Sequence, residues 1–167
     1  MSATNRGAKR NPQDFYSTPE SAFVPLLPFL PTDVSFWEPA QGDGRLVRWL
    51  TGSGRRAAGA DLATGQDFLV DATAREFVIT NPPFSHTLMK DGRGFLPHAL
   101  AVAPEVMLLL RLNFMGSQYR RDFFQSHEPS ALYVLSERPR FHGASGTDAC
   151  EYGWFYWGNR LSGIHHL

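Results

Sequence analysis

An apolar segment, a glycine-containing loop and a helical segment follow one another between residues 34 and 50. Residues 34–37 predict a buried strand, and residues 45–50 predict a helix. The loop between them contains Gly42-x-Gly44. Glycines let the backbone approach a ligand closely, beside the first turn of the following helix. Strand, glycine loop and helix in this order begin a βαβ unit, so the sequence predicts a parallel sheet.

Strands and helices alternate along the rest of the chain. This alternation predicts an α/β fold with a mostly parallel sheet and helices on both faces. We expect the last two strands, which are joined without a helix, to form an antiparallel edge pair. The segments expected to be strands are residues 56–62, 76–80, 106–112, 131–135 and 151–157, and helices are expected at 95–103 and 118–126.

The N-terminal part divides into a tail and the start of the domain. Residues 1–13 contain three basic residues and no acid, which predicts a flexible basic tail before a single domain at residues 14–167. Ser17 or Thr18 is expected to cap a helix that has Pro19 in its first turn. That helix should be short, because three more prolines follow between residues 25 and 31.

Composition excludes several classes of protein. With 43% hydrophobic and 19% charged residues among 167, the chain is globular. No apolar run approaches the ~20 residues of a membrane span, and the N-terminus lacks the apolar core of a signal peptide. The single cysteine, Cys150, excludes an internal disulfide and favours a reducing, cytoplasmic environment. No metal-ligand spacing is present, and His165-His166 is expected to be a frayed tail rather than a metal site.

The segment Asn81-Pro82-Pro83-Phe84 directly follows the predicted strand at 76–80. Each proline fixes its own φ and lacks an N–H, so the loop is stiff and presents acceptors without competing donors. Asn81 adds a side-chain carbonyl, and Phe84 adds a ring on which a planar group can stack. The loop therefore suits a planar amino group that donates two hydrogen bonds. Taken alone, it is equally consistent with an ordinary Asn-Pro loop.

Acidic residues follow the second predicted strand. Asp61 lies 17 residues after Gly44, where comparable folds place an acid that binds ribose hydroxyls. Asp67 can accept from an exocyclic amine, and Phe68 can cover an adenine face. Taken separately, each aspartate is better explained as a turn or cap residue. Their order along the chain favours the functional interpretation.

Together these segments resemble class I S-adenosylmethionine-dependent amino-methyltransferases, most closely the small phage-type DNA adenine N6-methyltransferases. The resemblance covers about residues 14–157. It implies a Rossmann-like fold, S-adenosylmethionine as the cofactor and a bacterial or phage origin. The matching motifs are the N-terminal motif Phe15-Tyr16-Ser17-Thr18-Pro19, the glycine loop Glu38-Pro39-Ala40-x-Gly42-x-Gly44, the ribose-binding acid Asp61, the adenine-binding pair Asp67-Phe68 and the catalytic loop Asn81-Pro82-Pro83-Phe84.

One departure from the family is visible. Only five residues separate Asp61 from Asp67, which is too few for the usual helix and full strand between those motifs. We therefore expect the sheet to be trimmed at that edge.

The resemblance implies methyl transfer to the N6 amine of adenine in DNA. Asn81 Oδ1 and the Pro82 carbonyl would accept the two N6–H groups while Phe84 stacks on the base. The base must be flipped out or single-stranded to reach the loop. Cytosine N4, RNA, protein glutamine and a non-catalytic binding module remain as alternatives.

Nucleic-acid contacts are predicted from local basic groups, since the net charge of zero gives no broad attraction. For any single arginine, a solvated surface position is the commoner explanation. The catalytic core uses almost the whole chain, so we expect no separate recognition domain and a monomer or homodimer. The candidate phosphate contacts are Arg120, Arg121, Arg138 and Arg140, with His142 in a loop over the target base.

Overall fold

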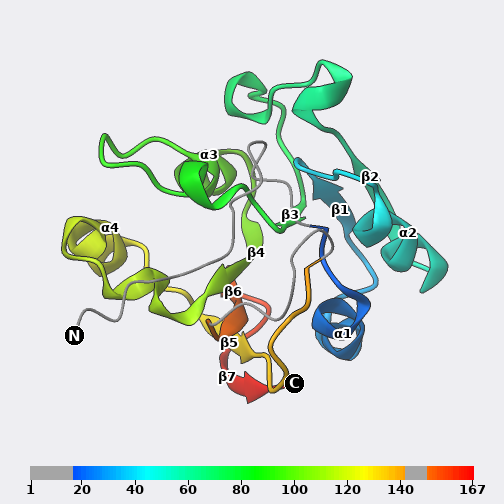
Figure 1. Cartoon of the computed structure of the whole chain (residues 1–167). Coiled ribbons are helices and arrows are strands. Elements are labelled where there is room, and N and C mark those ends of the chain that lie inside the picture. The colour runs from blue at the N-terminus through cyan, green and yellow to red at the C-terminus, as the bar shows by residue number, and fades with distance from the viewer. Residues whose placement is uncertain (1–16, 142–149) are drawn as a thin grey trace.

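The computed structural model describes residues 17–141 and 150–167. Within these residues, seven strands form one sheet in the order β2-β1-β3-β4-β6-β5-β7 (Figure 1). The strands from β2 to β4 are parallel, β6 is antiparallel to β4 and β5, and β7 is parallel to β5. The strands are β1 Ser35–Glu38, β2 Arg56–Gly59, β3 Phe77–Thr80, β4 Glu105–Arg111, β5 Ala131–Val134, β6 Tyr152–Trp157 and β7 Gly163–His166.

Helices cover both faces of the sheet, as the alternating pattern predicts (Figure 1). The helices α1 and α2 lie on one face, and α3 and α4 lie on the other. The α-helices are α1 Glu20–Phe23, α2 Arg45–Gly52, α3 Phe95–Val102 and α4 Arg121–Ser126. The short 3-10 helices are η1 Val24–Phe29, η2 Leu62–Thr64, η3 Phe68–Val70, η4 Phe84–His86, η5 Leu112–Gly116 and η6 Gln118–Arg120.

The core consists of two apolar layers, one on each face of the sheet. Alternate residues of a strand point to opposite faces, and β4 shows this period of two. Met107 and Leu109 belong to the layer beneath α1 and α2, whereas Leu108 and Leu110 belong to the layer beneath α3 and α4. All four side chains are fully buried. Burial on both faces explains why the sequence of β4 is a continuous apolar run rather than an alternating one.

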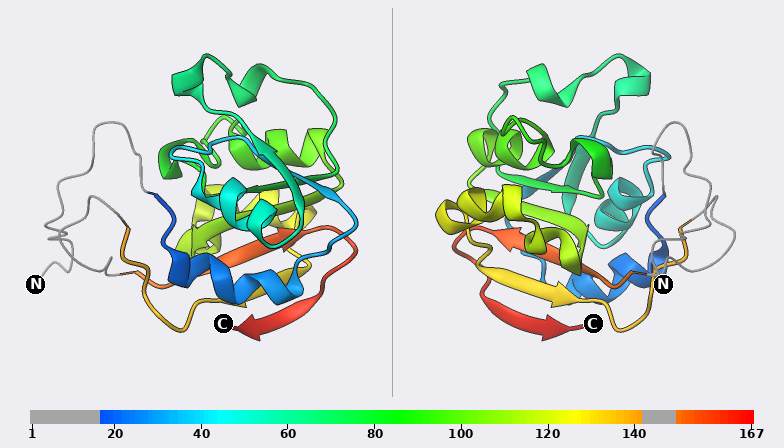
Figure 2. Two further views of the ribbon diagram at one scale, coloured as in Figure 1. Left: turned by 90° about the vertical axis from the view of Figure 1, so that its right-hand side faces the viewer. Right: turned by 60° about the vertical axis from the view of Figure 1, so that its left-hand side comes forward.

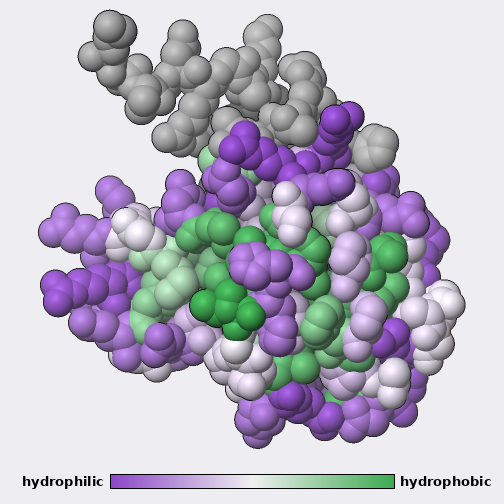
Figure 3. All heavy atoms as spheres, turned by 90° about the horizontal axis from the view of Figure 1, so that it is seen from below, coloured by the Kyte–Doolittle hydropathy of each residue, from purple (hydrophilic) through white to green (hydrophobic). Residues whose placement is uncertain are grey.

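The antiparallel pair of β5 and β6 is confirmed, but a further strand lies beyond it. Residues 165–166, expected as a frayed tail, belong to β7, so that expectation is wrong. The ring of His165 stacks on Tyr133 at 4.6 Å, and backbone hydrogen bonds join β7 to β5. Seen from this edge, apolar side chains gather between polar ones (Figure 3), and Phe29 and Ile164 are exposed hydrophobic residues of η1 and β7.

The first helix is short, as expected from its prolines, but its cap differs. Pro19 occupies the cap position of α1 and provides no side-chain hydrogen bond. Ser17 Oγ donates instead to Asp43 Oδ2 at 2.9 Å. The expected capping by Ser17 or Thr18 is therefore wrong, because this segment is bound to the glycine loop rather than to its own helix.

The sheet is trimmed beyond β2, as the spacing of Asp61 and Asp67 predicts. Residues 68–70 form the 3-10 helix η3 and not a strand. The segment with η2 and η3 projects above the rest of the molecule in both views of Figure 2. In the described ranges, no helix combines the length and apolar character needed to cross a bilayer.

Candidate active site

The strand order reverses between β1 and β3. The chain passes from β1 through α2 to β2 on one side, whereas β3 pairs with the other side of β1. In open α/β sheets, ligands bind in the crevice at such a point, outside the carboxyl ends of the strands. Here those ends carry Glu38 on β1 and Thr80 on β3, so the glycine loop and the Asn-Pro-Pro-Phe loop leave the sheet side by side.

A buried carboxylate joins the two strand ends. Glu38 is 1% exposed, and its Oε1 accepts from Thr80 Oγ1 at 2.8 Å. Burial raises the pKa of Glu38 to about 8, although the Thr80 hydroxyl and the Asn81 backbone N–H, which donate to the carboxylate, lower it. Within the part of the chain that the structure describes, Glu38 Oε2 has no hydrogen-bond partner. Such an oxygen is costly unless a ligand approaches it.

The glycine loop is held by a hydrogen bond to Asp61 and by one within the loop itself. The Gly42 N–H donates to Asp61 Oδ2 at 2.9 Å, and the Gly44 N–H donates to the Gln41 carbonyl at 2.7 Å. Gly44 has φ 73°, in the left-handed region that favours glycine, and precedes the first residue of α2. A side chain at Gly59 would place its Cβ 2.9 Å from the Glu38 carbonyl oxygen, so β2 approaches the loop closely.

The N-terminal segment lies against the same loop. Asp43 accepts from Ser17 Oγ and forms an ion pair with Arg45 at 2.6 Å. Arg45 Nη1 also donates to the Thr18 carbonyl at 3.4 Å. Ser17 and Thr18 are both buried. The N-terminal segment thus contacts the glycine loop.

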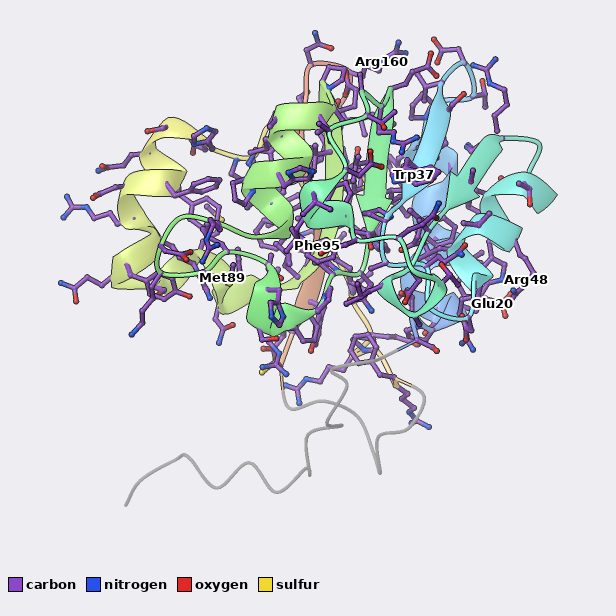
Figure 4. The ribbon with its side chains drawn as sticks, turned by 90° about the horizontal axis from the view of Figure 1, so that it is seen from above. Glu20, Trp37, Arg48, Met89, Phe95 and Arg160 are labelled. Atoms are coloured by element: carbon purple, nitrogen blue, oxygen red, sulfur yellow. The ribbon has the colours of Figure 1, made fainter. Side chains whose placement is uncertain are left out.

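These elements surround a cavity of about 380 Å³. Its lining includes Phe95 of α3, which lies between Met89 on the α4 side and Glu20 and Arg48 on the α2 side (Figure 4). A cavity of this size falls in the range of small-molecule sites. The predicted site residues that line it are Thr18, Glu38, Pro39, Ala40, Gly42, Asp61, Asp67, Phe68, Asn81 and Pro83.

Other predicted site residues are placed differently. Pro19, Gly44, Pro82 and Phe84 are not in the cavity lining. Phe15, Tyr16 and His142 lie outside the described residues.

Several lining residues were not predicted from the sequence. His86 follows the Asn-Pro-Pro-Phe loop, and Phe95 reaches the cavity from α3, but neither belongs to a motif that would have identified it. Asp43 and Gln41 occupy the variable positions of the glycine motif. Their position between the motif residues was the only signal in the sequence that could have identified them. The remaining unpredicted lining residues are Arg45, Leu46, Leu62, Gln66 and Leu69.

Both aspartates after β2 cap short helices and also line the cavity. Asp61 accepts from the Ala63 N–H at 2.9 Å, and Asp67 accepts from the Leu69 N–H at 3.0 Å. Phe68 is buried, with its ring 5.3 Å from that of Phe95. The structural and functional interpretations of these residues are therefore compatible.

The Asn-Pro-Pro-Phe loop is anchored by its own backbone. The Pro83 carbonyl accepts from the His86 N–H at 2.9 Å and from Thr87 Oγ1 at 3.1 Å. Pro82 is buried, whereas Asn81 and Pro83 are half-buried. The loop therefore presents Asn81 and Pro83 to the cavity from a fixed base.

The candidate nucleic-acid contacts differ in how they are engaged. The Arg120 guanidinium lies 3.9 Å from the Phe114 ring centre and donates to the Phe114 carbonyl at 2.8 Å. Arg138 forms an exposed ion pair with Glu151 at 2.6 Å. Arg121 and Arg140 are exposed. Arg121 and Arg140 are thus better placed than Arg120 to contact a phosphate.

The charged side chains of the described cavity lining are mostly acidic. Glu38, Asp43, Asp61 and Asp67 contribute carboxyl groups, and the only arginine in the described lining, Arg45, is paired with Asp43. No group of three or more His, Cys, Asp or Glu side chains in the described ranges is arranged to hold a metal ion.

Comparison with known proteins shows what this fold is similar to. No protein-family model and no curated protein matches the sequence. Among solved structures, a Listeria monocytogenes protein described as a class I S-adenosylmethionine-dependent methyltransferase aligns with a TM-score of 0.62 at 13% identity. The alignment covers 90% of this chain and 65% of that one.

Two further structures show the same likeness. A protein from Vibrio vulnificus YJ016, described as a modification subunit of a type I restriction enzyme, aligns with a TM-score of 0.59 at 13% identity, over 92% of this chain and 46% of that one. A protein from Pyrococcus horikoshii, described as an RNA methyltransferase, aligns with a TM-score of 0.54 at 11% identity, over 84% and 80%. The chain thus spans less than two thirds of the first two proteins. The predicted Rossmann-like class I methyltransferase fold is confirmed.

Proposed function

We propose that this protein transfers a methyl group from S-adenosylmethionine to the N6 amine of adenine in DNA, with the base flipped out or single-stranded. The observation that carries the proposal is the Glu38 carboxylate. It ends β1, directly before the glycine loop, and accepts hydrogen bonds from the end of β3. Glu38 therefore joins the glycine loop, which suits a methyl donor, to the Asn-Pro-Pro-Phe loop, which suits an amine.

The cavity fits the donor by size and by charge. S-adenosylmethionine, when bound, supplies an electrophilic methyl group on a sulfonium centre. The acids in the lining suit its two cationic groups. Glu38, whose Oε2 has no hydrogen-bond partner among the described residues, is the candidate to bind its ammonium group. Asp61 is the candidate for the ribose hydroxyls, and Phe68 with Leu62 for the adenine ring.

The Asn-Pro-Pro-Phe loop fits the acceptor. The lone pair of adenine N6 is delocalised into the ring, which makes the nitrogen a poor nucleophile. If Asn81 Oδ1 and the Pro82 carbonyl each accept one N6–H, the lone pair is directed toward the methyl group. The nitrogen would then bond to the methyl carbon as the carbon–sulfur bond breaks. S-adenosylhomocysteine would leave as a neutral thioether, and the surplus proton on the nitrogen would pass to water. The rate enhancement comes from the positioning of the amine and from the carbonyl dipoles of Asn81 and Pro82 that point at it.

Two exposed basic segments flank the loop and support a nucleic-acid substrate. Arg140 precedes Phe141, whose ring contacts Phe84 at 6.5 Å. For the second segment, Tyr119 Oη donates to the Leu88 carbonyl at 3.5 Å. This hydrogen bond holds the turn before Arg121 close to the residues that follow η4. Phosphate contacts at these positions would fix the strand without reading its sequence.

The proposal is tested by transfer of a labelled methyl group to DNA and RNA oligonucleotides, followed by nucleoside mass analysis. We expect N6-methyladenine in DNA. Methylated cytosine in DNA, or methylation of RNA alone, would replace the proposed substrate, and no transfer to any nucleic acid would contradict the proposal.

A pair of asparagine variants sharpens this test. Asn81→Ala should reduce turnover by on the order of a hundredfold or more, because one aimed acceptor is lost, and should leave donor binding intact. Asn159→Ala is the matched control. Asn159 is exposed, and its neighbour Arg160 lies at the amino-terminal end of β4, away from Phe95 (Figure 4). Near-normal turnover of Asn81→Ala would refute the role of the loop.

A further inference from the structure

Phe84 packs against a cluster of aromatic rings and does not line the donor cavity. Its ring centre lies 5.9 Å from that of Tyr152 and 6.5 Å from that of Phe141. Both partners are buried, and their own ring centres are 5.1 Å apart. The protein core therefore supports the Phe84 ring on the side of these two residues.

Arg111 completes this support from a different strand. It is the last residue of β4 and lies directly opposite Tyr152 in the antiparallel pairing with β6. Its Nε donates to the Tyr152 hydroxyl at 2.9 Å. Its guanidinium carbon lies 5.1 Å from the Phe84 ring centre and 5.8 Å from the Tyr152 ring centre. One side chain thus contacts both rings.

The chemistry of arginine suits this position. Its guanidinium is planar, stacks on aromatic faces and stays charged at every relevant pH. The hydrogen bond to Tyr152 fixes one direction within the guanidinium plane, because Nε–H lies in that plane. The guanidinium in turn limits the orientations open to Phe84. Tyr152 is fully buried, so the chain of contacts begins in the rigid core.

We propose that Arg111 is a positioning residue for methyl transfer, which holds the Phe84 ring in the orientation on which the target base stacks. This inference rests on the proposed function, since it assigns Phe84 to the base. Arg111 acts through Phe84, and neither residue lines the donor cavity. Its loss should therefore affect turnover rather than donor affinity.

A double-mutant cycle tests the proposal. Arg111→Met keeps an apolar stem but removes the planar cation, and should lower kcat about tenfold or more, since small displacements of reacting groups can cost a hundredfold. The dissociation constant for S-adenosylmethionine should stay within about twofold. In the Phe84→Ala background, Arg111→Met should have no further effect, because its target is already absent. Arg111→Lys, which keeps the charge but not the plane, should recover only part of the rate.

Arg55→Met is the matched control for a purely structural role. Arg55 donates to the carbonyls of Leu27, Leu30 and Pro31, far along the chain from the loop. Its loss should lower the melting temperature, and any effect on kcat should multiply with that of Phe84→Ala. Multiplying effects for Arg111→Met and Phe84→Ala, or an equal loss of donor affinity, would overturn the proposal.

The outcome for the proposed function is read separately. If the wild-type protein transfers no methyl group, or if Asn81→Ala stays active, the proposed function fails. The positioning of Phe84 is then measured by the NMR signals of its isotopically labelled ring in the wild type and in Arg111→Met. Signals that change position or broaden agree with positioning by Arg111, and unchanged signals overturn it.

Discussion

Replacement of Glu38 by glutamine should make this protein more stable at high pH. The carboxyl group is 1% exposed, and burial raises its pKa from 4.5 to about 8. The folded state therefore binds more protons than the unfolded state between these two values. The contribution of Glu38 to the free energy of unfolding is fully present below about pH 4.5, falls as the pH rises toward 8, and then levels off. Glutamine mimics the protonated carboxyl group and has no such dependence.

The size of the effect follows from the shift in the pKa. The difference between 4.5 and about 8 corresponds to about 5 kcal/mol, because one pKa unit is worth about 1.4 kcal/mol. For a chain of this length, 1 kcal/mol shifts the melting temperature by about 2–4 °C. Between pH 5 and pH 8.5, the melting temperature of Glu38→Gln should therefore rise by about 10 °C relative to that of the wild type.

Thermal unfolding followed by circular dichroism across this pH range provides the assay. The difference between the two proteins is the informative quantity. Glu105, whose pKa is also raised by burial, titrates in both proteins, and its contribution cancels. A difference that stays constant from pH 5 to 8.5 would refute the buried, protonated state of Glu38. A difference that moves in the opposite direction would show that the site favours the carboxylate even without a ligand.

Three further expectations concern other parts of the molecule. Asp61→Ala should weaken S-adenosylmethionine binding about tenfold in calorimetry, because a ligand contact and a loop anchor are both lost, and an unchanged affinity would contradict its role. Gly94→Ala should lower stability by about 2–3 kcal/mol, since φ is 133° and a Cβ would lie 2.5 Å from a carbonyl oxygen, whereas Gly116→Ala, with open space, should not. Arg121→Ala should reduce the slope of log binding constant against log salt concentration by about one unit for an oligonucleotide. Arg120→Ala should instead lower the melting temperature. The reverse pattern would contradict the placement of the two arginines.

Much of the fold could be predicted from the sequence because its elements have local signals. The apolar run of β4 and the strand, glycine loop and helix around residue 42 are visible without any tertiary information. The last strand was missed for a physical reason. Residues 163–166 carry a glycine, one apolar residue and two histidines, and they form a strand because Tyr133 and Phe29 provide rings against which His165 packs. No local pattern encodes such a partner.

Cavity-lining residues were predicted where backbone requirements create a motif, and missed where packing alone brings a side chain to the cavity. Gly42 and Asp61 were identified because loop geometry and strand ends restrict the residue type. Phe95 and His86 were not, because their place depends on how α3 and η4 lie against the sheet. Arg120 shows the opposite case. A basic pair suggested two equivalent contacts, whereas the fold directs one guanidinium onto Phe114.

The trimmed edge of the sheet leaves the candidate site intact because the hydrogen bonds of Glu38 and Gly42 join the ends of β1, β2 and β3, which are all present. Glu38 receives its bonds from the end of β3, and Gly42 donates to Asp61 at the end of β2. A further strand would support the part of the cavity that Asp67 and Phe68 line. Here η3 takes that place, since Phe68 packs on Phe95 and on His98 at 4.7 Å, and so rests on α3. The smaller sheet therefore has its edge supported by α3 through η3. The cavity depends on α3 more directly than the glycine motif alone would suggest.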